Sequence, residues 1–525
     1  MKRIVLSILS LVMAFVAMAN PVGVEQARKV GASWLSSRGH YGAVKLAVVE
    51  SPFADIYVFN ADGGGFVIVA ADDCARPILG YSLTGSFRVE QMPANVRSWL
   101  KDYGHEIGET KAVKQGSRGN ANEWRLLSAG TVPEQPLTTA VSPLLTTTWD
   151  QSPLYNNMCP YDSVYGQRVV TGCVATATAQ IMKYWNHPAT GYGSHSYEAQ
   201  NDHISYGVLS ADFGATNYAW DIMPNALTSV SSAAEIDAVA LLMQHVGIAV
   251  EMHYNVSSQN GSGAYNHSDY YPSSMSALVE YFKYAPDIVV VAPGNYNNIT
   301  YSAILRAELD QRRPILYDGR DENGGHSFVC DGYDESGYFH FNWGWGGYCD
   351  GYYALGALNP SPGGTGGNAT YTFNMSNSAM LRIRPNTNFG VGGTVTVNIV
   401  GGDSACAVTG AGTYSFGDTV TLAATAPEGY RFAGWSDNSS ANPRIFIMTG
   451  GDYNFTARFE SISGDTMSYC GNMPHTNYWG EYDQNIDKYW GIKLPASSLA
   501  QGRTLSAIEF YVGSSYYYVC FTEIT

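Results

Sequence analysis

The sequence predicts an α+β fold for the middle of the chain, preceded by a smaller α+β unit and followed by all-β modules. Two patterns in residues 141–385 predict this fold: apolar residues at helical spacing in the first part and short β-type runs in the later part. After residue 385 the composition changes to strands rich in Thr, Val and Gly. Since 525 residues exceed what one core supports, we expect three or four domains in succession.

The charge of the chain excludes some classes of partner. Charged residues make up only 14%, and the formal net charge is -16 at pH 7. Binding to nucleic acid or to an anionic membrane requires clustered Lys and Arg side chains, and the sequence has no such cluster. We therefore expect neither a nucleic-acid partner nor an anionic membrane surface.

The N-terminus, residues 1–19, reads as a signal peptide. Lys2-Arg3 precede an apolar run from Ile4 to Val16, and Ala17-Met18-Ala19 match an A-x-A cleavage site. The run is shorter than the roughly 20 residues that cross a bilayer, and we expect no later membrane span. We predict a secreted protein, extracellular or on the cell surface.

Residues 20–140 predict a small α+β domain that ends in a linker. A helix is expected over residues 24–35, then strands over 55–59 and 66–70 joined by a turn at 62–65, then a helix over 94–107. The polar stretch 111–143 shows little periodicity, so we interpret it as a linker open to proteolysis.

Residues 141–385 predict a helical half followed by a β half, with a cleft between them. The expected helices and β runs are, in order, 173–185, 234–246, 275–284, 302–311, and then 315–317, 327–333 and 338–343.

Two all-β modules follow. In residues 386–461, strands are expected over 394–397, 419–422, 445–448 and 454–459, and GDTVTLAATAPEGYRFAGWSD resembles the B repeats of internalin-type surface proteins. Residues 462–525 continue in short Tyr-rich strands, for which we expect a β-sandwich-like module that is incomplete at Thr525.

A candidate nucleophile lies in the segment VVTGCVATATAQIMKYWNHP. Cys173 follows Thr171-Gly172 at the start of an expected helix that ends before Pro188. The N–H groups and dipole at a helix start favour a thiolate and can bind an oxyanion. Taken alone, the segment fits a buried or disulfide-bonded cysteine as well.

A candidate general base follows 153 residues later, where Gly324-Gly325 precede His326. Asn342 comes 16 residues after His326, in a stretch that reads Asn-Trp-Gly-Trp-Gly. Papain-like enzymes place a thiol at a helix start and an imidazole, fixed by a third group, roughly 130–150 residues downstream. His340 is a rival base, since it alternates onto the same strand face as Asn342, but the glycines before His326 favour His326.

Together the two segments resemble the streptopain family of bacterial cysteine peptidases, across about residues 20–385. The resemblance implies a papain-like catalytic fold of two subdomains. It also implies that the Cys173 thiol attacks peptide carbonyls, that His326 transfers protons and that Asn342 orients the imidazole. The tryptophans of this stretch, Trp343 and Trp345, would shield that hydrogen bond.

The same resemblance implies two further features. Gln151, in TTTWDQSPLYNNMCP, matches the segment whose Gln completes the oxyanion hole, although an ordinary loop amide remains an alternative. GGGFVIVAADDCARPILGYS, at 63–82, resembles the core of an inhibitory prodomain that would cover the cleft until the linker is cut. Because the family pattern calls for one cysteine and this chain has eight, disulfides within the catalytic domain are an open alternative.

No cofactor or metal site is predicted. HExxH, CxxC and GxSxG motifs are absent from the sequence, and His195 and His203 lack a matching ligand set. The expected function is a cysteine endopeptidase made as a zymogen, acting on proteins or peptides. Two alternatives stay open: a cell-wall peptide hydrolase with the same Cys-His pair, and a catalytically inert surface adhesin.

Overall fold

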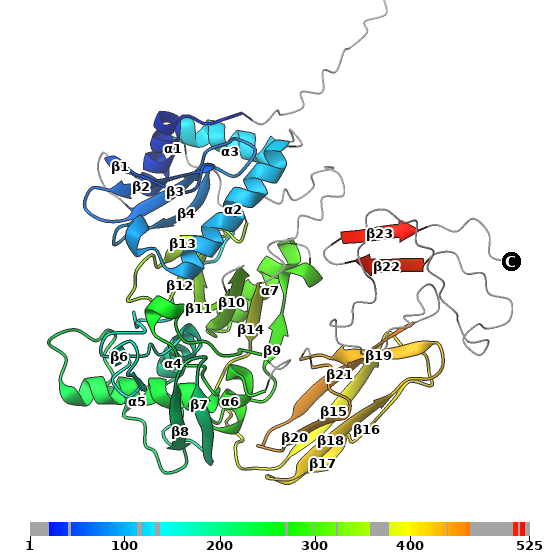
Figure 1. The fold of residues 1–525 in the computed structure, drawn as a ribbon. Helices are drawn as coiled ribbons and strands as arrows, with labels where there is room; N and C mark the ends of the chain where they lie inside the picture. The colour runs from blue at the N-terminus through cyan, green and yellow to red at the C-terminus, as the bar shows by residue number, and fades with distance from the viewer. Residues whose placement is uncertain are drawn as a thin grey trace, which may run out of the picture. The chain divides into compact units, whose positions relative to one another are not determined.

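The structure is a computed structural model whose described residues include nearly all of positions 20–461 (Figure 1). They are 20–39, 44–112, 118–131, 137–267, 271–296, 298–321, 324–356, 377–437, 439–461, 508–512 and 515–519. The chain divides into two units, Met1–Gly464 and Asp465–Thr525, and each is described by itself. The predicted signal peptide lies outside the described residues.

Residues 20–131, called the first domain below, form an antiparallel sheet with three helices. The predicted helices and the hairpin are confirmed, and the turn at 62–65 joins the two paired strands of that hairpin. Helix α1 packs on this sheet and beside α3 (Figure 1). The elements are α1 (Val24–Ser37), β1 (Leu46–Val49), β2 (Ile56–Ala61), β3 (Phe66–Ala70), β4 (Ile78–Ser82), α2 (Ala94–Ala112) and α3 (Arg118–Ser128).

Helix α3 corrects the prediction of a linker over 111–143. Trp124 is buried and donates from Nε1 to the carbonyl oxygen of Ala75 at 2.9 Å. Asn120, expected in an exposed stretch, is fully buried and donates to the carbonyl oxygen of Cys74 at 2.6 Å. The helix is invisible to periodicity because most of its residues are polar. Tertiary contacts with the first domain stabilise it.

The central domain, residues 137–385, shares one ten-stranded sheet with the first domain. The strand order is β1-β2-β3-β4-β13-β12-β11-β10-β14-β9, so β4 of the first domain pairs with β13 of the central domain. In this antiparallel pair Tyr81 lies opposite Tyr352 and Gly80 opposite Tyr353. A Cβ on Gly80 would lie 2.8 Å from the Tyr353 ring, so only glycine allows this approach. The central strands are β9 (Val289–Val291), β10 (Ile315–Asp321), β11 (Gly324–Tyr333), β12 (Phe339–Asn342), β13 (Gly351–Tyr353) and β14 (Ser378–Leu381).

The two faces of this sheet belong to two different cores. On β11, Phe328 joins a core that also contains first-domain residues, whereas Val329 joins the core around helix α4. Helix α2 packs against β10 and β11 on the first of these faces. Its Trp99 contacts Phe328 and Phe341 edge to face, at ring centroid distances of 6.1 and 5.0 Å.

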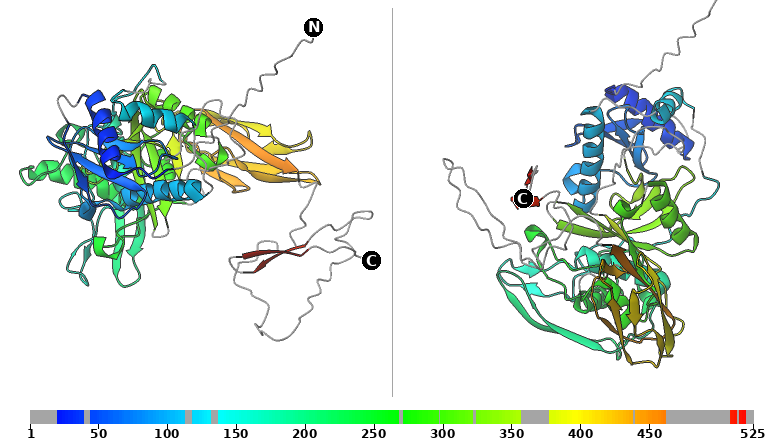
Figure 2. Two further views of the ribbon diagram at one scale, coloured as in Figure 1. Left: turned by 90° about the horizontal axis from the view of Figure 1, so that it is seen from above. Right: turned by 90° about the vertical axis from the view of Figure 1, so that its right-hand side faces the viewer.

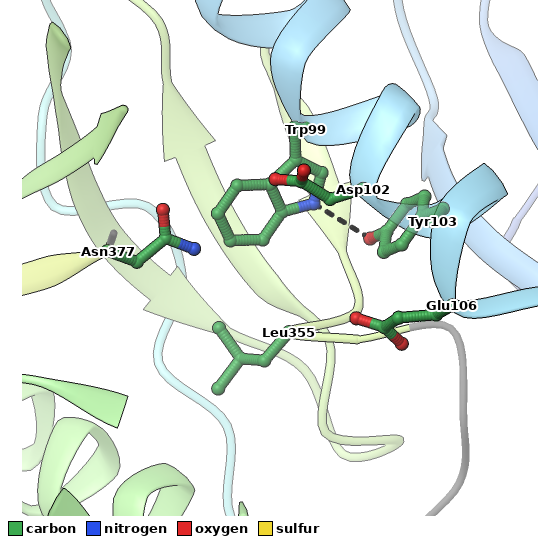
Figure 3. Close-up of a pocket in the computed structure, with 6 residues that line it drawn as sticks. All are labelled: Trp99, Asp102, Tyr103, Glu106, Leu355 and Asn377. Carbon is green, nitrogen blue, oxygen red and sulfur yellow. Dashed lines mark hydrogen bonds between the residues drawn. The ribbon is translucent and has the colours of Figure 1, made fainter. Parts of the chain in front are cut away.

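Helix α2 also lines a small pocket against the central domain (Figure 3). Trp99 donates from Nε1 to the Tyr103 hydroxyl at 2.9 Å, and that hydroxyl lies 2.5 Å from the carbonyl oxygen of Ala354. The remaining lining residues are Asp102, Glu106, Leu355 and Asn377.

The helices of the central domain confirm the predicted helical half. They are α4 (Cys173–Trp185), α5 (Ala233–Ala249), α6 (Ser274–Glu280) and α7 (Asn298–Asp310). Two strand pairs in this half were missed by the sequence analysis. The pair β5 (Tyr161–Asp162) with β6 (Gln167–Arg168) precedes α4, and the pair β7 (Ser194–Gln200) with β8 (Ser205–Asp212) lies between α4 and α5. The β7–β8 hairpin and helix α1 lie at opposite ends of the first unit (Figures 1 and 2).

The third domain, from residue 386 to 461, confirms the predicted β module. It has two sheets, in the orders β17-β15-β21-β19 and β16-β18-β20, around a core that includes Trp435 and Phe455. A bidentate pair, Arg384 with Asp287 at 2.7 and 2.9 Å, lies where this domain follows the central one. The strands are β15 (Gly393–Val400), β16 (Ala407–Thr409), β17 (Gly412–Tyr414), β18 (Thr419–Thr425), β19 (Tyr430–Trp435), β20 (Arg444–Ile447) and β21 (Tyr453–Ser461).

In the second unit the structure describes one hairpin, β22 (Ile508–Val512) with β23 (Ser515–Val519). The remainder of the predicted β-sandwich-like module lies outside the described residues. Among the helices of the described residues, none combines the length and the apolarity that a membrane crossing needs.

A buried ion pair lies at the junction of the first and central domains. Arg38 approaches Asp334 at 3.5 Å, and their side chains are 9% and 7% exposed. The Tyr81 hydroxyl donates to the same carboxylate at 2.7 Å. Burial raises the pKa of Asp334, and the Arg38 charge opposes that rise. The Arg38 charge thus offsets part of the cost of burying the Asp334 carboxylate.

Replacing Arg38 by Met should loosen the junction strongly. The Asp334 carboxylate would be left buried without its cation, which costs about 3–5 kcal/mol when one partner of a buried pair is removed. Urea denaturation of the full chain measures this loss. The control is Arg28→Met on helix α1, since Arg28 pairs with an exposed Glu25. Equal effects of the two substitutions would contradict the prediction.

Candidate active site

Cys173 is the first residue of helix α4, as predicted, and Gly172 is the N-cap residue that precedes it. Gly172 has φ of 88°, in the region that favours glycine. A Cβ at this position would lie 2.8 Å from the Met252 sulfur and 3.0 Å from the carbonyl oxygen of Ser262. The conformation and the packing both demand glycine, and they fix where the helix begins.

The Cys173 thiol is 9% exposed, and burial raises its pKa. The backbone N–H and hydroxyl of Ser327 hydrogen-bond the sulfur and act in the opposite direction, while the charge of Asp318 adds to the rise. The backbone N–H of Val174 at the helix start also acts in favour of the thiolate, but burial raises the pKa by more than these groups lower it.

His326 lies on β11, paired in register with Gly319 of β10, and is partly buried. Its neighbour Ser327 donates to Asp318 at 2.8 Å on the sheet face toward α4. Successive strand residues point to opposite faces, so His326 shares the face of Phe328. Cys173 and His326 therefore come from neighbouring elements, and Ser327 is the β11 residue at the thiol.

His340, the rival base, has a different environment. Its Nδ1 lies 2.6 Å from the Asp331 carboxylate, which also accepts from the backbone N–H of Leu145 at 2.9 Å. On β12 it pairs with Gly332 of β11, six residues from His326, or roughly 20 Å along a strand. Burial lowers the pKa of His340, but the charge and hydrogen bond of Asp331 outweigh it, so the pKa is raised. Since Cys173 lies at Ser327, His340 is remote from the thiol.

Asn342 ends β12 and is 3% exposed. Its Nδ2 donates to the carbonyl oxygen of Thr147 at 2.7 Å and to Gln180 Oε1 at 3.3 Å. Its Oδ1 accepts from Gln180 Nε2 at 3.0 Å and from the backbone N–H of Gly344 at 3.1 Å. The amide thus connects β12 to helix α4 and to the segment before Trp149.

The two tryptophans of the same stretch differ in burial. Trp343 is fully buried, donates from Nε1 to the carbonyl oxygen of Cys349 at 3.0 Å, and lies 4.6 Å from Phe328 between ring centroids. Trp345 is partly buried against the core that the first domain shares. From helix α2, Asn95 donates to the carbonyl oxygen of Trp343 at 3.0 Å. The first domain therefore holds this stretch directly.

Gln151 is buried and lies beside the nucleophile segment. Its carbonyl oxygen accepts from the backbone N–H of Thr171 at 3.3 Å, two residues before Cys173. Its own N–H donates to the Asp150 carboxylate at 2.6 Å. The structure thus brings together the segments of Gln151 and Cys173, as the sequence predicted.

Gln180 is the residue of this site that sequence reasoning missed. It is fully buried in α4 and bonds both Asn342 and the backbone of Trp149. A signal was present, because Gln180 is a large polar residue seven positions after Cys173, on a helix rich in Ala and other apolar residues.

The other cysteines of the described residues are free thiols. Within the described residues six cysteines are free and buried, among them Cys159, Cys330 and Cys349 of the central domain. The alternative of disulfides in this domain is wrong for these residues, since their thiols are packed separately in the cores. Cys470 and Cys520 lie outside the described residues.

The histidines weighed as metal ligands pair with carboxylates. His195 lies 3.0 Å from Glu251, and His203 lies 3.2 Å from Asp162. A search of the described residues finds no group of three or more His, Cys, Asp or Glu side chains arranged to hold a metal ion.

Comparison with known families divides the chain close to the boundaries of the three domains described above. Residues 149–353 match the Peptidase C10 family, residues 19–107 match the Spi protease inhibitor, and residues 390–463 match the divergent InlB B-repeat domain.

Individual proteins are similar over 60–65% of the chain. Streptopain of Streptococcus pyogenes serotype M1 is 34% identical over 343 residues, which are 63% of this chain and 81% of that protein. The thiol protease/hemagglutinin PrtT of Porphyromonas gingivalis is 34% identical over 328 residues, 60% of this chain and 36% of that protein. The solved prointerpain A fragment of Prevotella intermedia superposes with a TM-score of 0.51 at 32% identity, covering 65% of this chain and 99% of that one.

These matches confirm the streptopain resemblance and the α+β, papain-like fold, with an inhibitor-like first domain and β modules behind the catalytic one. The chain belongs to the Peptidase C10 family, and it is a cysteine-type endopeptidase whose inhibitor-like prodomain precedes its catalytic domain.

Proposed function

We propose that this chain is the zymogen of a secreted cysteine endopeptidase in which Cys173 is the nucleophile and His326 the general base. The observation that carries the proposal is the position of Cys173. It begins α4, beside the β11 residue that follows His326, and one hydrogen bond from the Gln151 segment. A secreted enzyme fits the signal-like sequence of residues 1–19.

The proposed chemistry follows from these groups. The thiolate of Cys173 attacks the carbonyl carbon of a peptide bond, after its proton has passed to His326. The backbone N–H of Cys173, free at the helix start, and the Gln151 side chain bind the oxyanion. His326 then protonates the leaving amine and activates the water that hydrolyses the thioester. Asn342 orients the imidazole, and the tryptophans Trp343 and Trp345 keep water from that bond.

The precursor is proposed to be inactive because the prodomain packs on the sheet that carries His326. Helix α2 packs on β10 and β11, and its Asn95 donates to the carbonyl oxygen of Trp343 at 3.0 Å. Burial also raises the pKa of the Cys173 thiol, which disfavours the reactive thiolate. These contacts support inhibition by the docked prodomain.

Activation is proposed to require a cut between the prodomain and the catalytic domain. The position of α3 limits the residues at which this cut can occur. Cleavage was expected anywhere in 111–143, but α3 is packed into the prodomain over Arg118–Ser128. On the far side, Val141 pairs with Tyr333 of the catalytic domain. We therefore propose that the activating cut lies in residues 129–140.

Cys173→Ala or His326→Ala should lower kcat/KM by about four orders of magnitude or more, because catalytic members act as a unit. Hydrolysis of fluorescent casein by the cleaved variants measures this loss, and circular dichroism checks that each variant is folded. Substantial activity in folded Cys173→Ala enzyme would refute the mechanism.

His340→Gln should affect stability more than chemistry. The folded pKa of His340 is raised by Asp331, so its charged pair stabilises the fold fully below the unfolded pKa of about 6.5 and is lost as pH rises through the folded value. The difference in unfolding free energy between wild type and variant should therefore be largest near pH 6 and shrink toward pH 9. Urea titrations across this range measure it. A loss of kcat as large as that of His326→Ala would instead assign the base to His340.

A separately expressed prodomain, residues 20–131, should inhibit the mature enzyme, and Trp99→Ala should weaken this inhibition. Trp99 packs on four aromatic rings of the catalytic domain, and truncating a buried Trp costs about 3–5 kcal/mol, or roughly 100-fold or more in affinity. The inhibition constant is the measurement. Val48→Ala, on an exposed position of β1, is the control. Saturating wild-type fragment without any effect on rate would limit the prodomain to a role in folding.

A further inference from the structure

Gln180 is an amide in the centre of the catalytic domain with no exposed surface. It lies seven residues after Cys173 in α4, which is two helical turns, so the two residues share a helix face about 10 Å apart. Burying an amide is costly unless hydrogen bonds satisfy it. Its position on the nucleophile helix therefore needs a physical reason.

Hydrogen bonds satisfy the buried amide of Gln180. Its Oε1 accepts from the Thr147 hydroxyl at 2.8 Å and from the backbone N–H of Trp149 at 3.1 Å. Its Nε2 donates to Asn342 Oδ1 at 3.0 Å, and Asn342 Nδ2 returns a longer bond of 3.3 Å. One side chain on α4 thus holds two other segments in fixed positions.

Each of those two segments leads to a group in the proposed chemistry. Trp149 is two residues before Gln151, whose carbonyl oxygen meets the segment before Cys173. Asn342 is the proposed orienting group, and its Oδ1 is shared between Gln180 and the backbone N–H of Gly344. A shift of Gln180 would move both groups relative to the thiol.

We propose that Gln180 is a positioning residue of the peptidase, setting the placement of Gln151 and Asn342 relative to Cys173. It acts through these residues, since its own amide lies two turns from the sulfur. The inference rests on the proposed roles of Cys173, Gln151 and Asn342. Loss of activity in Cys173→Ala tests those roles first and separately.

Gln180→Glu is the informative variant, because it preserves size and can still accept from Thr147 and Trp149. Its carboxylate cannot donate to Asn342 Oδ1. Variant precursors are cleaved with bead-bound wild-type enzyme, which is then removed. At pH 8 we expect kcat to fall about 10- to 100-fold, the size of effect that a small misplacement causes, with KM within about 3-fold of wild type.

The pH dependence gives a readout that a merely structural role would not move. Burial raises the pKa of a carboxylic acid, and below that pKa the acid regains an O–H donor. The wild-type to Gln180→Glu ratio of kcat should therefore shrink as pH falls from 8 to 5.5 and widen as it rises. A ratio that is constant across this range would contradict the proposal.

A double-mutant cycle tests the route through Asn342. If Gln180 acts partly through Asn342, the double variant Gln180→Glu/Asn342→Ala should lose less kcat/KM than the product of the two single losses. Fully multiplicative effects would overturn this route. The matched control is Tyr218→Phe, which removes a buried 3.0 Å hydrogen bond to His245 elsewhere in the domain. An unchanged kcat in Gln180→Glu, or a loss that Tyr218→Phe reproduces, would reduce Gln180 to a purely structural role.

Discussion

The pairing of β4 with β13 is the constraint on which the precursor depends. It joins two domains through backbone hydrogen bonds and makes one ten-stranded sheet of them. A sheet edge left open is exposed to other strands, so the prodomain covers an edge of the catalytic domain as it docks. The same docking completes a hydrophobic core, since Trp34 of the first domain packs on Tyr338 and Trp99 packs on Phe341. The prodomain is thus built into the fold of the precursor.

Local sequence predicted those elements whose signals are local. Helix α4 has its predicted bounds because Gly172 can start it and the apolar residues recur at helical spacing. Helix α3 could not be predicted, since its few apolar contacts, such as Trp124, lie against a distant loop at Ala75. The β4–β13 pair was also out of reach, because it joins strands about 270 residues apart that carry no pairing signal of their own.

The candidate site divides in the same way. The sequence indicated the three segments that contain Gln151, Cys173 and His326 from their residue types and order. The structure places those segments together. The raised pKa of the thiol could not be foreseen, because it follows from burial under residues that are remote in sequence. Nor could the contacts of Gln180, since three separate segments must meet before its amide is satisfied.

Hydrogen bonds on both sides of α4 hold the helix that carries the candidate nucleophile. On one side Gln180 holds the segments of Trp149 and Asn342. On the other side Thr178 bonds Ser274 at 3.1 Å, and Ser274 bonds Asn266 at 3.0 Å.

Asn266 in turn bonds Asp318 and Ser327, the residues that surround the thiol on β10 and β11. Each of these buried polar groups would be costly to leave unpaired, so the helix and its nucleophile form a fixed support.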